Sequence, residues 1–267
     1  MKGNESIVWE SVEKIRRTSP VVHNITNYVV MNSTANALLA IGASPVMAHA
    51  GEEVEDMVNI ARALVINIGT LSREWVKSMF SAAEQATKRG IPVILDPVGA
   101  GATRYRTETA REFLKTIRPA IVRANASEIM ALFEEGAKTK GVDSTDASHD
   151  AIAAARGISG ACGAVVCVSG ETDYIITGDR TVKIGNGHPM MTRVTGMGCA
   201  ATALCGAFAA VDKDYVKAAA HAMAVMGIAG EMAAEKAAGP GSLEVGFLDA
   251  LYGLTAKDVE ERLKMEP

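Results

Sequence analysis

The sequence predicts an α/β protein with a mostly parallel central sheet, an antiparallel edge and helices on both faces. Short apolar runs alternate with amphipathic stretches, and the first five runs begin roughly 20 to 30 residues apart, the length of a strand plus a crossover helix. Several runs are apolar on consecutive residues, as in strands buried on both faces of a parallel sheet. Two further segments flank Gly178-Asp179, a strong signal of an antiparallel hairpin.

The elements follow in chain order. Six apolar runs are the expected parallel strands: residues 20–23, 45–48, 64–68, 92–95, 120–122 and 164–168. Between two of them, residues 72–89 form an amphipathic helix with Trp75, Met79, Ala82 and Ala86 on one face. The acidic run 52–56 suits a solvated first helical turn, where negative charge is favourable. The hairpin strands are 173–177 and 180–184, and residues 198–265 follow as three helices, broken near Asp212 and at 239–241.

Composition and charge exclude several classes of protein. With 48% hydrophobic and 22% charged residues, the chain has the composition of a globular protein and not of a disordered one. A net charge of −4 argues against nucleic acid or an anionic membrane surface as the main partner. The apolar stretch 194–211 contains Gly and Thr and predicts a buried helix, not a membrane span. We expect a single domain over residues 1–267.

The cysteines and the N-terminal residues indicate the compartment. The four cysteines, Cys162, Cys167, Cys199 and Cys205, include no CxxC pair, so they predict neither a disulfide scaffold nor a zinc site. The first 17 residues are rich in charge and lack the apolar core of a signal peptide. We therefore expect a cytoplasmic protein.

Polar residues directly after the predicted strands mark the expected site. In open parallel sheets, ligands bind beyond the carboxyl ends of the strands, where loops lead into helices. An acid-bearing polar rim on an apolar sheet favours an enzyme site over a scaffold. The rim contains His23, Asn24, Asn27, Met47, His49, Asn67, Thr70, Asp96, Arg123, Glu128, Ser169 and the segment 195–199. The other histidines, His149, His188 and His221, form no metal-ligand spacing with them, and His23 fits a side chain packed at the rim.

The glycine loop Thr195-Gly-Met-Gly-Cys199 turns straight into a helix of small residues. Glycines let backbone N–H groups approach an anion, and the helix N-terminus adds a partial positive charge. A tight turn with close helix packing is the alternative. Cys199 lies in the first helical turn, where its pKa can fall and favour the thiolate, although a small buried residue explains a cysteine equally well.

Asp96 follows an apolar strand and precedes a glycine-containing loop, a suitable place to hold Mg²⁺ near phosphates. The alternative is an Asp that caps the next helix. Asn125 and Glu128 have the spacing of a capping box, which explains Asn125 without a ligand. Arg123, at the end of an apolar strand, places a guanidinium at the rim. Asp96, Glu128 and Arg123 together supply two carboxylates for a hydrated magnesium and one cation for phosphate oxygens, and hydrolysis by a metal-bound water would fit them too.

Six ordered segments resemble the hydroxyethylthiazole kinase family. They are His23-Asn-Ile-Thr-Asn-Tyr28, Gly42-Ala-Ser-Pro-Val-Met47, Asn67-Ile-Gly-Thr70, Asp96-Pro-Val-Gly-Ala-Gly101, Arg123-Ala-Asn-Ala-Ser-Glu128 and Val194-Thr-Gly-Met-Gly-Cys199, with Gly239-Pro-Gly-Ser242 closing the pattern. The resemblance covers about residues 21–254. It implies a ribokinase-like three-layer fold and ATP-dependent phosphorylation of the hydroxyl of 4-methyl-5-(2-hydroxyethyl)thiazole, a step of thiamine salvage.

The resemblance also implies site roles. Catalysis falls to Gly198, Cys199 and Asp96, thiazole binding to Met47, Gly196 and Asn24, and ATP binding to Arg123, Ser169 and Thr195. Asp96 and Glu128 resemble the acids on the magnesium side. The resemblance further implies a homotrimer with active sites between subunits. The wider ribokinase superfamily has an Asp as base where this chain has Cys199, a departure that the thiazole kinases share.

Three alternatives stay open at the level of sequence. The first is another ribokinase-like kinase, acting on a hydroxymethylpyrimidine or a pyridoxal-like ring. The second is a non-catalytic nucleotide-binding sensor, which would have no need of Asp96, Glu128 and Arg123. The third is a nicotinamide-dependent dehydrogenase, which the missing GxGxxG after the first strand disfavours.

Overall fold

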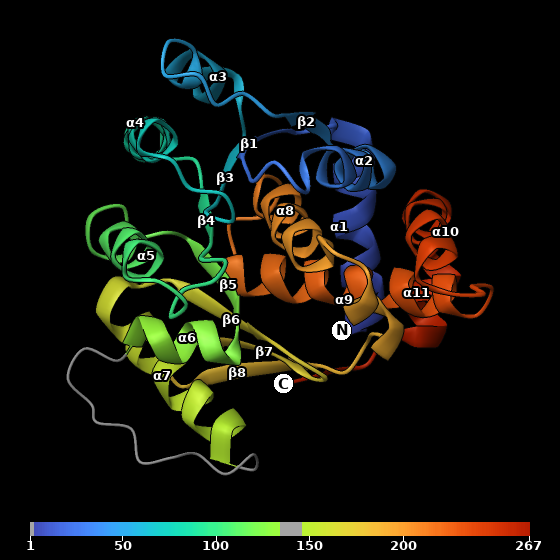
Figure 1. Cartoon of the computed structure of the whole chain (residues 1–267). Helices are drawn as coiled ribbons and strands as arrows, with labels where there is room; N and C mark the ends of the chain where they lie inside the picture. The colour runs from blue at the N-terminus through green and yellow to red at the C-terminus, as the bar shows by residue number, and fades with distance from the viewer. Residues whose placement is uncertain (1–2, 134–145) are drawn as a thin grey trace.

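One sheet runs through the middle of the computed structural model, which describes residues 3–133 and 146–267 (Figure 1). Within the described residues the sheet has nine strands in the order β2-β1-β3-β4-β5-β6-β7-β8-β9. Strands β1 to β6 pair in parallel, and β7, β8 and β9 add an antiparallel edge. The bounds are β1 (Val21–Ile25), β2 (Ser44–Val46), β3 (Ala63–Asn67), β4 (Val93–Asp96), β5 (Ile121–Asn125), β6 (Val165–Ser169), β7 (Asp173–Thr177), β8 (Arg180–Ile184) and β9 (Met265–Glu266). The six parallel strands and the hairpin are confirmed.

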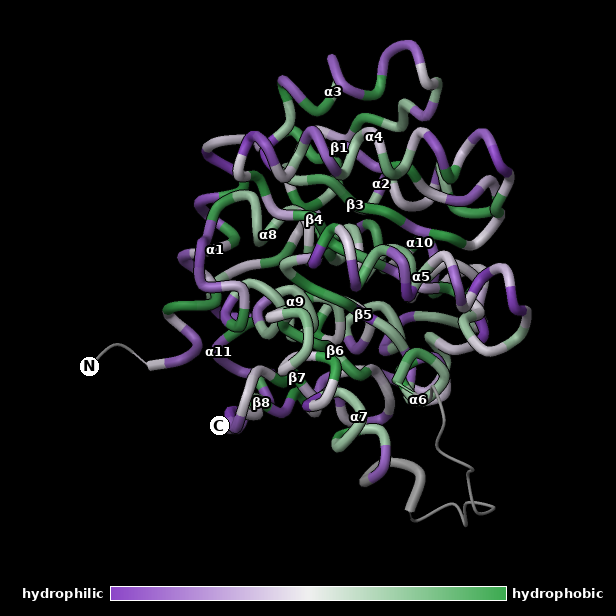
Figure 2. The backbone as a smooth tube through the Cα atoms, turned by 90° about the vertical axis from the view of Figure 1, so that its left-hand side faces the viewer, coloured by the Kyte–Doolittle hydropathy of each residue, from purple (hydrophilic) through white to green (hydrophobic). Residues whose placement is uncertain are grey.

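Helices cover both faces of this sheet, which gives the three layers that we expected (Figure 1). One apolar core lies under α1 (Asn4–Thr18), α2 (Met31–Ile41), α8 (Met197–Ala209), α9 (Tyr215–Ala234), α10 (Pro240–Gly253) and α11 (Ala256–Arg262). A second core on the opposite face lies under α3 (Val54–Ile60), α4 (Arg73–Arg89), α5 (Arg104–Thr116), α6 (Ala126–Phe133) and α7 (Asp146–Cys162). In Figure 2 the strand β3 is largely apolar, whereas α3 at the surface alternates between hydrophilic and hydrophobic residues.

Helix α8 explains why the stretch 194–211 is apolar and small. Its residues from Ala200 to Ala209 are all buried. A Cβ on Gly206 would lie only 2.6 Å from Val65 Cγ2 of β3, so glycine lets the helix pack directly on the sheet. This close packing brings the first turn of α8 to the carboxyl ends of the central strands. Among the described helices, none combines the length and the apolar character that a bilayer crossing needs.

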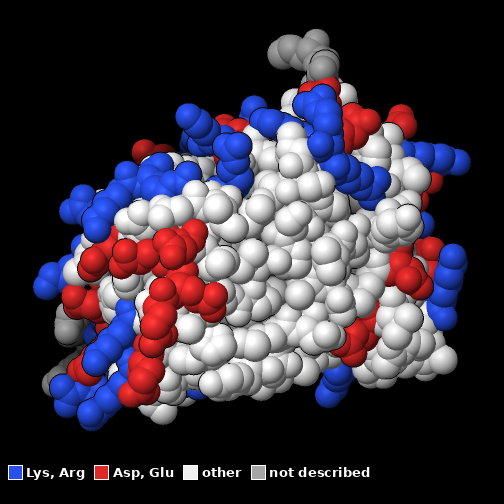
Figure 3. Space-filling model, turned by 90° about the horizontal axis from the view of Figure 1, so that it is seen from above, with Lys and Arg blue, Asp and Glu red and all other residues white. Residues whose placement is uncertain are grey.

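The two helix predictions on the other face are confirmed. Helix α4 begins after Ser72, whose hydroxyl accepts a hydrogen bond from the Trp75 N–H at 3.2 Å, and it buries Trp75, Met79, Ala82 and Ala86. The acidic run leads into α3, with Glu55 and Asp56 exposed in its first turn. Figure 3 views the molecule from the end where α3 lies: acidic side chains gather on one part of this surface, beside a wide area without charged side chains.

The C-terminal region differs from the prediction of three helices. The breaks near Asp212 and at Gly239 are present, but the last segment is divided again into α10, α11 and the short strand β9. Thr255 causes the division: its hydroxyl accepts a hydrogen bond from the Asp258 N–H (3.3 Å), and Asp258 Oδ2 accepts one from the Thr255 N–H (2.9 Å). This capping box was present in the sequence and starts a new helix.

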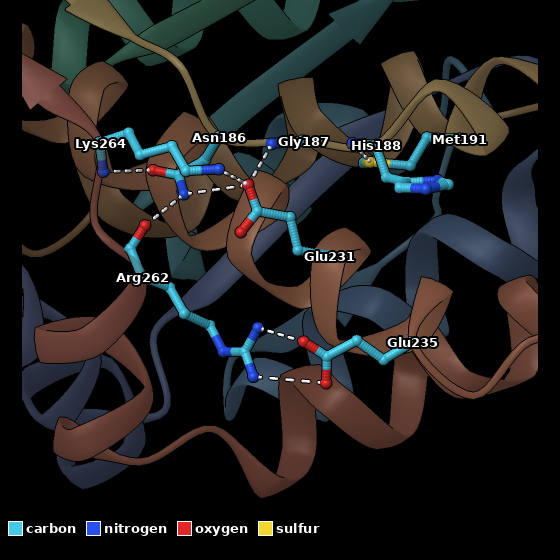
Figure 4. Close-up of polar contacts among 8 residues, drawn as sticks. All are labelled: Asn186, Gly187, His188, Met191, Glu231, Glu235, Arg262 and Lys264. Carbon is cyan, nitrogen blue, oxygen red and sulfur yellow. Dashed lines mark hydrogen bonds and ion pairs between the residues drawn. The ribbon is translucent and has the colours of Figure 1, made fainter.

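A polar cluster fixes this C-terminal end to the rest of the protein (Figure 4). Glu231 Oε1 of α9 accepts hydrogen bonds from the Gly187 N–H (3.0 Å) and the Lys264 ammonium (2.9 Å). The Asn186 amide reaches the same oxygen (3.3 Å), and its Oδ1 accepts from the Lys264 N–H (2.8 Å). We call Asn186, Glu231 and Lys264 the C-terminal cluster. It joins α9 to the segments that follow β8 and precede β9.

Candidate active site

The candidate site lies where the carboxyl ends of β1, β3, β4, β5 and β6 meet the first turn of α8. The sheet register brings its members together, because Asn67 pairs with Asp96 across β3 and β4, and Asn125 pairs with Ser169 across β5 and β6. This is the edge at which open parallel sheets bind ligands. All four cysteines are free thiols.

Asp96 is buried at the end of β4, with 1% of its surface exposed. Its Oδ2 accepts hydrogen bonds from the Asn67 amide (2.9 Å) and the Thr202 hydroxyl of α8 (2.8 Å). The pKa of the carboxyl is raised to about 7, chiefly by burial and also by nearby Glu128, although Arg123 and both hydrogen bonds oppose the change. The capping alternative is wrong, because the next helix, α5, begins at Arg104 and is capped by Thr103. A buried carboxyl with a perturbed pKa at this edge is a mark of function.

A chain of side-chain amides links Asp96 to Cys199. Asn67 Oδ1 accepts a hydrogen bond from the Asn27 amide (2.8 Å), and the same Asn27 nitrogen donates to Cys199 Sγ (3.5 Å). Backbone N–H groups fix the orientation of both amides, because Val29 N donates to Asn27 Oδ1 (3.1 Å) and Gly69 N donates to Asn67 Oδ1 (3.0 Å). We call Asn27, Asn67, Asp96 and Thr202 the strand-end cluster.

Cys199 occupies the predicted place in the first turn of α8, but its predicted thiolate character is wrong. Burial and the nearby Asp96 raise the pKa of the thiol to about 11, whereas the Asn27 and Asn67 amides and Arg123 lower it. The partial charge at a helix N-terminus is small compared with the cost of a second buried anion beside Asp96. The thiol is therefore protonated at neutral pH, with its sulfur accepting from Asn27.

Arg123, Ser169 and Gly198 come together as the sequence predicts. The guanidinium of Arg123 donates to Ser169 Oγ at 2.7 Å. A Cβ on Gly198 would lie 2.7 Å from Arg123 Nη1, so a side chain at this position would displace the guanidinium that now lies against the loop. The arrangement places a cation beside the N-terminus of α8, where both attract anionic oxygens.

Glu128 makes the predicted contacts with Asn125 and one further contact with the loop after Asp96. It forms the capping box with Asn125: Glu128 Oε2 accepts from the Asn125 N–H (3.0 Å), and Asn125 Oδ1 accepts from the Glu128 N–H (2.9 Å). The capping explanation of Asn125 is thus confirmed. Glu128 Oε1 also accepts from the Gly99 N–H (2.8 Å) in the loop after Asp96. Both carboxylate oxygens hold backbone N–H groups, which suits contact with a metal through water.

The donor set fits a magnesium ion bound together with phosphates. Among the described residues, no group of three or more His, Cys, Asp or Glu side chains could enclose a metal ion. Mg²⁺ keeps several waters and is commonly held by one or two carboxylates plus substrate phosphates. Asp96 and Glu128, close enough that Glu128 raises the pKa of Asp96, are such a pair.

The structure brings together only some of the residues expected to bind the substrate ring, which are Met47, Gly196 and Asn24. Gly196 caps α8 with a positive φ of 86°, and with Thr195 and Met197 it lines a small apolar cavity of about 20 Å³ against Phe247 of α10. Met47 is half-buried just after β2. Asn24 is buried in β1, where its amide donates to the Val22 carbonyl (2.9 Å) and its Oδ1 has no partner among the described residues.

His23 packs at the rim as expected, with Nε2 at 2.8 Å from the Ala48 carbonyl oxygen.

Two residues that contribute to the site, Thr202 and Arg106, were not predicted from the sequence. Thr202 could have been found, because it lies three residues after Cys199 and so faces the same side of the helix. Arg106 donates to three backbone carbonyls beside the site, and nothing in its sequence context distinguishes it from other helical arginines.

Comparison with known proteins gives one consistent family. Residues 12–257 match the model of the hydroxyethylthiazole kinase family. A hydroxyethylthiazole kinase of Syntrophus aciditrophicus is 64% identical over 260 residues, 96% of each chain. The structure of a hydroxyethylthiazole kinase from Pyrococcus horikoshii superposes with a TM-score of 0.91 at 43% identity and covers 98% of both chains. A ribokinase-like superfamily protein from Enterococcus faecalis, 14% identical with a TM-score of 0.63 over 86% of each chain, shares the fold. The ribokinase-like fold is confirmed.

Proposed function

The chain belongs to the hydroxyethylthiazole kinase family, and from this premise we propose that it transfers the γ-phosphoryl group of ATP to the side-chain hydroxyl of 4-methyl-5-(2-hydroxyethyl)thiazole. The observation that carries the proposal is the buried Asp96, with a pKa raised by burial to about 7, beside Arg123 and the glycine loop of α8. Phosphoryl transfer requires chiefly positioning and neutralisation of charge. This edge of the sheet offers both.

Each site residue then has a defined task. Asp96 and Glu128 would hold Mg²⁺, which neutralises charge on the transferred phosphoryl group. Arg123, Ser169 and Thr195 would bind ATP, with Arg123 positioned by Ser169 and Gly198. Gly196 and Gly198 open the N-terminus of α8 to phosphate oxygens. Met47, Gly196 and Asn24 would line the thiazole side.

The protonated thiol changes the role that we assign to Cys199. At its raised pKa of about 11 the thiol is not a ready general base. A loose transition state needs little early deprotonation of the alcohol. Cys199 then acts by lying beside the hydroxyl, with Asn27 holding the sulfur in place, and the rate of transfer depends mainly on the metal side of the site.

The experiment is a panel assay with purified protein, Mg²⁺ and ATP. Hydroxyethylthiazole, hydroxymethylpyrimidine and pyridoxal are compared by ADP release, and mass spectrometry identifies the phosphorylated product. We expect phosphorylated hydroxyethylthiazole and at least a tenfold preference for it. Turnover of another ring alcohol in its place would favour the second kinase class, and binding of ATP without any product would favour a sensor.

We also propose a homotrimer with sites shared between subunits, as the family resemblance implies. Tyr28 and Val29, directly after Asn27 of the strand-end cluster, are both 65% exposed, an unusual exposure for apolar side chains next to a buried site. The wide uncharged area in Figure 3 is consistent with a covered surface. Light scattering under assay conditions should give three times the 28.0 kDa chain mass. A fully active monomer would contradict the proposal.

A further inference from the structure

Arg106, in the first turn of α5, is a side chain beside the site that makes three hydrogen bonds and has no role in the proposed function. Its Nη1 donates to the Ile68 carbonyl (2.9 Å) and the Val98 carbonyl (2.7 Å), and its Nη2 donates to the Gly69 carbonyl (2.6 Å). These acceptors belong to two loops, one after β3 and one after β4. A half-buried guanidinium therefore joins the two loops that leave the strands ending in Asn67 and Asp96.

The peptide units that Arg106 holds are those that position the site. The Ile68 carbonyl and the Gly69 N–H form one peptide unit, and that N–H donates to Asn67 Oδ1 (3.0 Å). The Val98 carbonyl and the Gly99 N–H form another, and that N–H donates to Glu128 Oε1 (2.8 Å). Because C=O and N–H point in opposite directions in a peptide unit, the cation on the oxygen both orients and polarises the N–H.

We infer that Arg106 is a positioning residue, which fixes Asn67 and Glu128, and through Asn67 also Asp96, without touching any of the three. The inference rests on the proposed function, which assigns Asp96 and Glu128 to the metal side of the site. The loop packs tightly on the arginine: at Gly99, with a φ of +74°, a Cβ would lie 3.2 Å from Arg106 Cδ. A forked guanidinium reaches three carbonyls at once, whereas a lysine ammonium is a point charge and cannot hold both loops in this way.

Arg16 provides a matched control. Its guanidinium also donates to three backbone carbonyls, those of Leu251 (3.1 Å), Tyr252 (3.0 Å) and Leu254 (3.0 Å), and it is also half-buried. It lies at the end of α1, just before the amino end of β1, and fastens the end of α10. The two arginines make the same kind of contact at opposite ends of the parallel strands.

The experiment compares Arg106→Lys and Arg106→Leu with Arg16→Lys and Arg16→Leu in the full chain. We expect Arg106→Lys to lower kcat by about 10- to 100-fold, to raise the Mg²⁺ concentration needed for half-maximal rate, and to leave KM for the thiazole within about twofold. Amide hydrogen exchange of the protein alone should become at least about tenfold faster at Gly69 and Gly99. Arg16→Lys should lower the thermal midpoint with kinetics and exchange at these glycines unchanged.

Two results would overturn the inference: Arg106→Lys with wild-type kcat and wild-type exchange, or equal losses of kcat in the two lysine variants. If Arg106→Leu fails to fold, Arg106→Lys carries the test. Failure of the proposed function is distinguishable, because it would appear as a wild-type protein without activity toward the thiazole. The exchange measurement does not depend on that activity.

Discussion

The strand-end cluster, which is fully buried, and the C-terminal cluster, which is partly exposed, are both networks of polar side chains around a carboxylate, but only the second places a cation in contact with its carboxylate. In the C-terminal cluster, the Lys264 ammonium lies 2.9 Å from Glu231 Oε1, so a cation compensates the carboxylate directly. In the strand-end cluster, the donors to the Asp96 carboxylate among the described side chains are the neutral Asn67 and Thr202. The nearby Arg123 donates to Ser169, and burial still raises the pKa of Asp96 to about 7.

The difference separates a structural contact from a functional one. A carboxylate that is paired and hydrogen-bonded stabilises the fold it belongs to. A buried carboxyl without a contacting cation costs stability, and such sites persist where the charge is needed for binding or catalysis. Glu231 therefore fixes the end of the chain, whereas Asp96 is the carboxyl that, in the proposed function, would hold a metal ion.

The largest expected effect is that of Asp96→Asn on catalysis. The amide keeps the shape of the side chain and can still accept from Asn67 and Thr202, but it removes the charge that would hold Mg²⁺. We expect kcat to fall by about 10³-fold or more, a greater loss than any change at Cys199. Steady-state kinetics measure the loss, and circular dichroism checks the fold. A loss of less than tenfold would show that the Asp96 carboxylate is not required for the reaction.

Changes at Cys199 should cost less, because a protonated thiol contributes little as a base. We expect Cys199→Ala to lose at most about 100-fold and Cys199→Ser to behave like Ala. Cys199→Asp should keep substantial activity or exceed the wild type, since a carboxylate there can accept the proton of the hydroxyl. An inactive Cys199→Asp beside a fully active Cys199→Ala would mean that Cys199 only packs.

The pKa of Asp96 predicts a pH dependence with a definite sign. Below about pH 7 the carboxyl is protonated and neutral, so its affinity for a cation falls as the pH decreases. The carboxyl carbon of Asp96, followed by ¹³C NMR in the protein without Mg²⁺, should titrate near pH 7, and Mg²⁺ with a nucleotide should shift the midpoint downward. The Asp96→Asn spectrum identifies the signal. A midpoint below 5 without Mg²⁺ would contradict the conclusion that the buried Asp96 carboxyl lacks a compensating cation.

Glu231→Gln should have the smallest effect on activity. It removes the charge that faces Lys264 but leaves an amide that can still accept from the Gly187 N–H. We expect a loss of about 0.5–2 kcal/mol in the free energy of unfolding and kcat within about twofold of wild type. Urea unfolding and steady-state kinetics measure the two quantities. A tenfold loss of kcat without a loss of stability would contradict the structural role that we assign to Glu231.

The sequence predicted the framework of this molecule better than the details of its site. Apolar runs and the Gly178-Asp179 turn predict strands because burial and turn geometry depend on residues close in the chain. Asp96, Arg123 and Ser169 were found for the same reason, since each ends a strand. The charge state of Cys199 could not be found, because it depends on Asp96 and Asn27, which are distant in sequence. Arg106 was missed because its acceptors are backbone carbonyls, which carry no sequence signature.

The most direct test of the contrast between the clusters is the free energy of unfolding of Asp96→Asn relative to wild type, measured in urea from pH 4 to pH 8. The pKa of Asp96 is about 7 in the folded protein, against an ordinary value of 3.8, so wild-type stability falls as the pH rises between these values. Asp96→Asn should be more stable than wild type at pH 8, by about 1–4 kcal/mol, and the difference should vanish near pH 4. Glu231→Gln should be less stable at pH 8. An Asp96→Asn variant that is less stable than wild type at pH 8 would contradict the conclusion that Asp96 is a charge held for function at a cost to the fold.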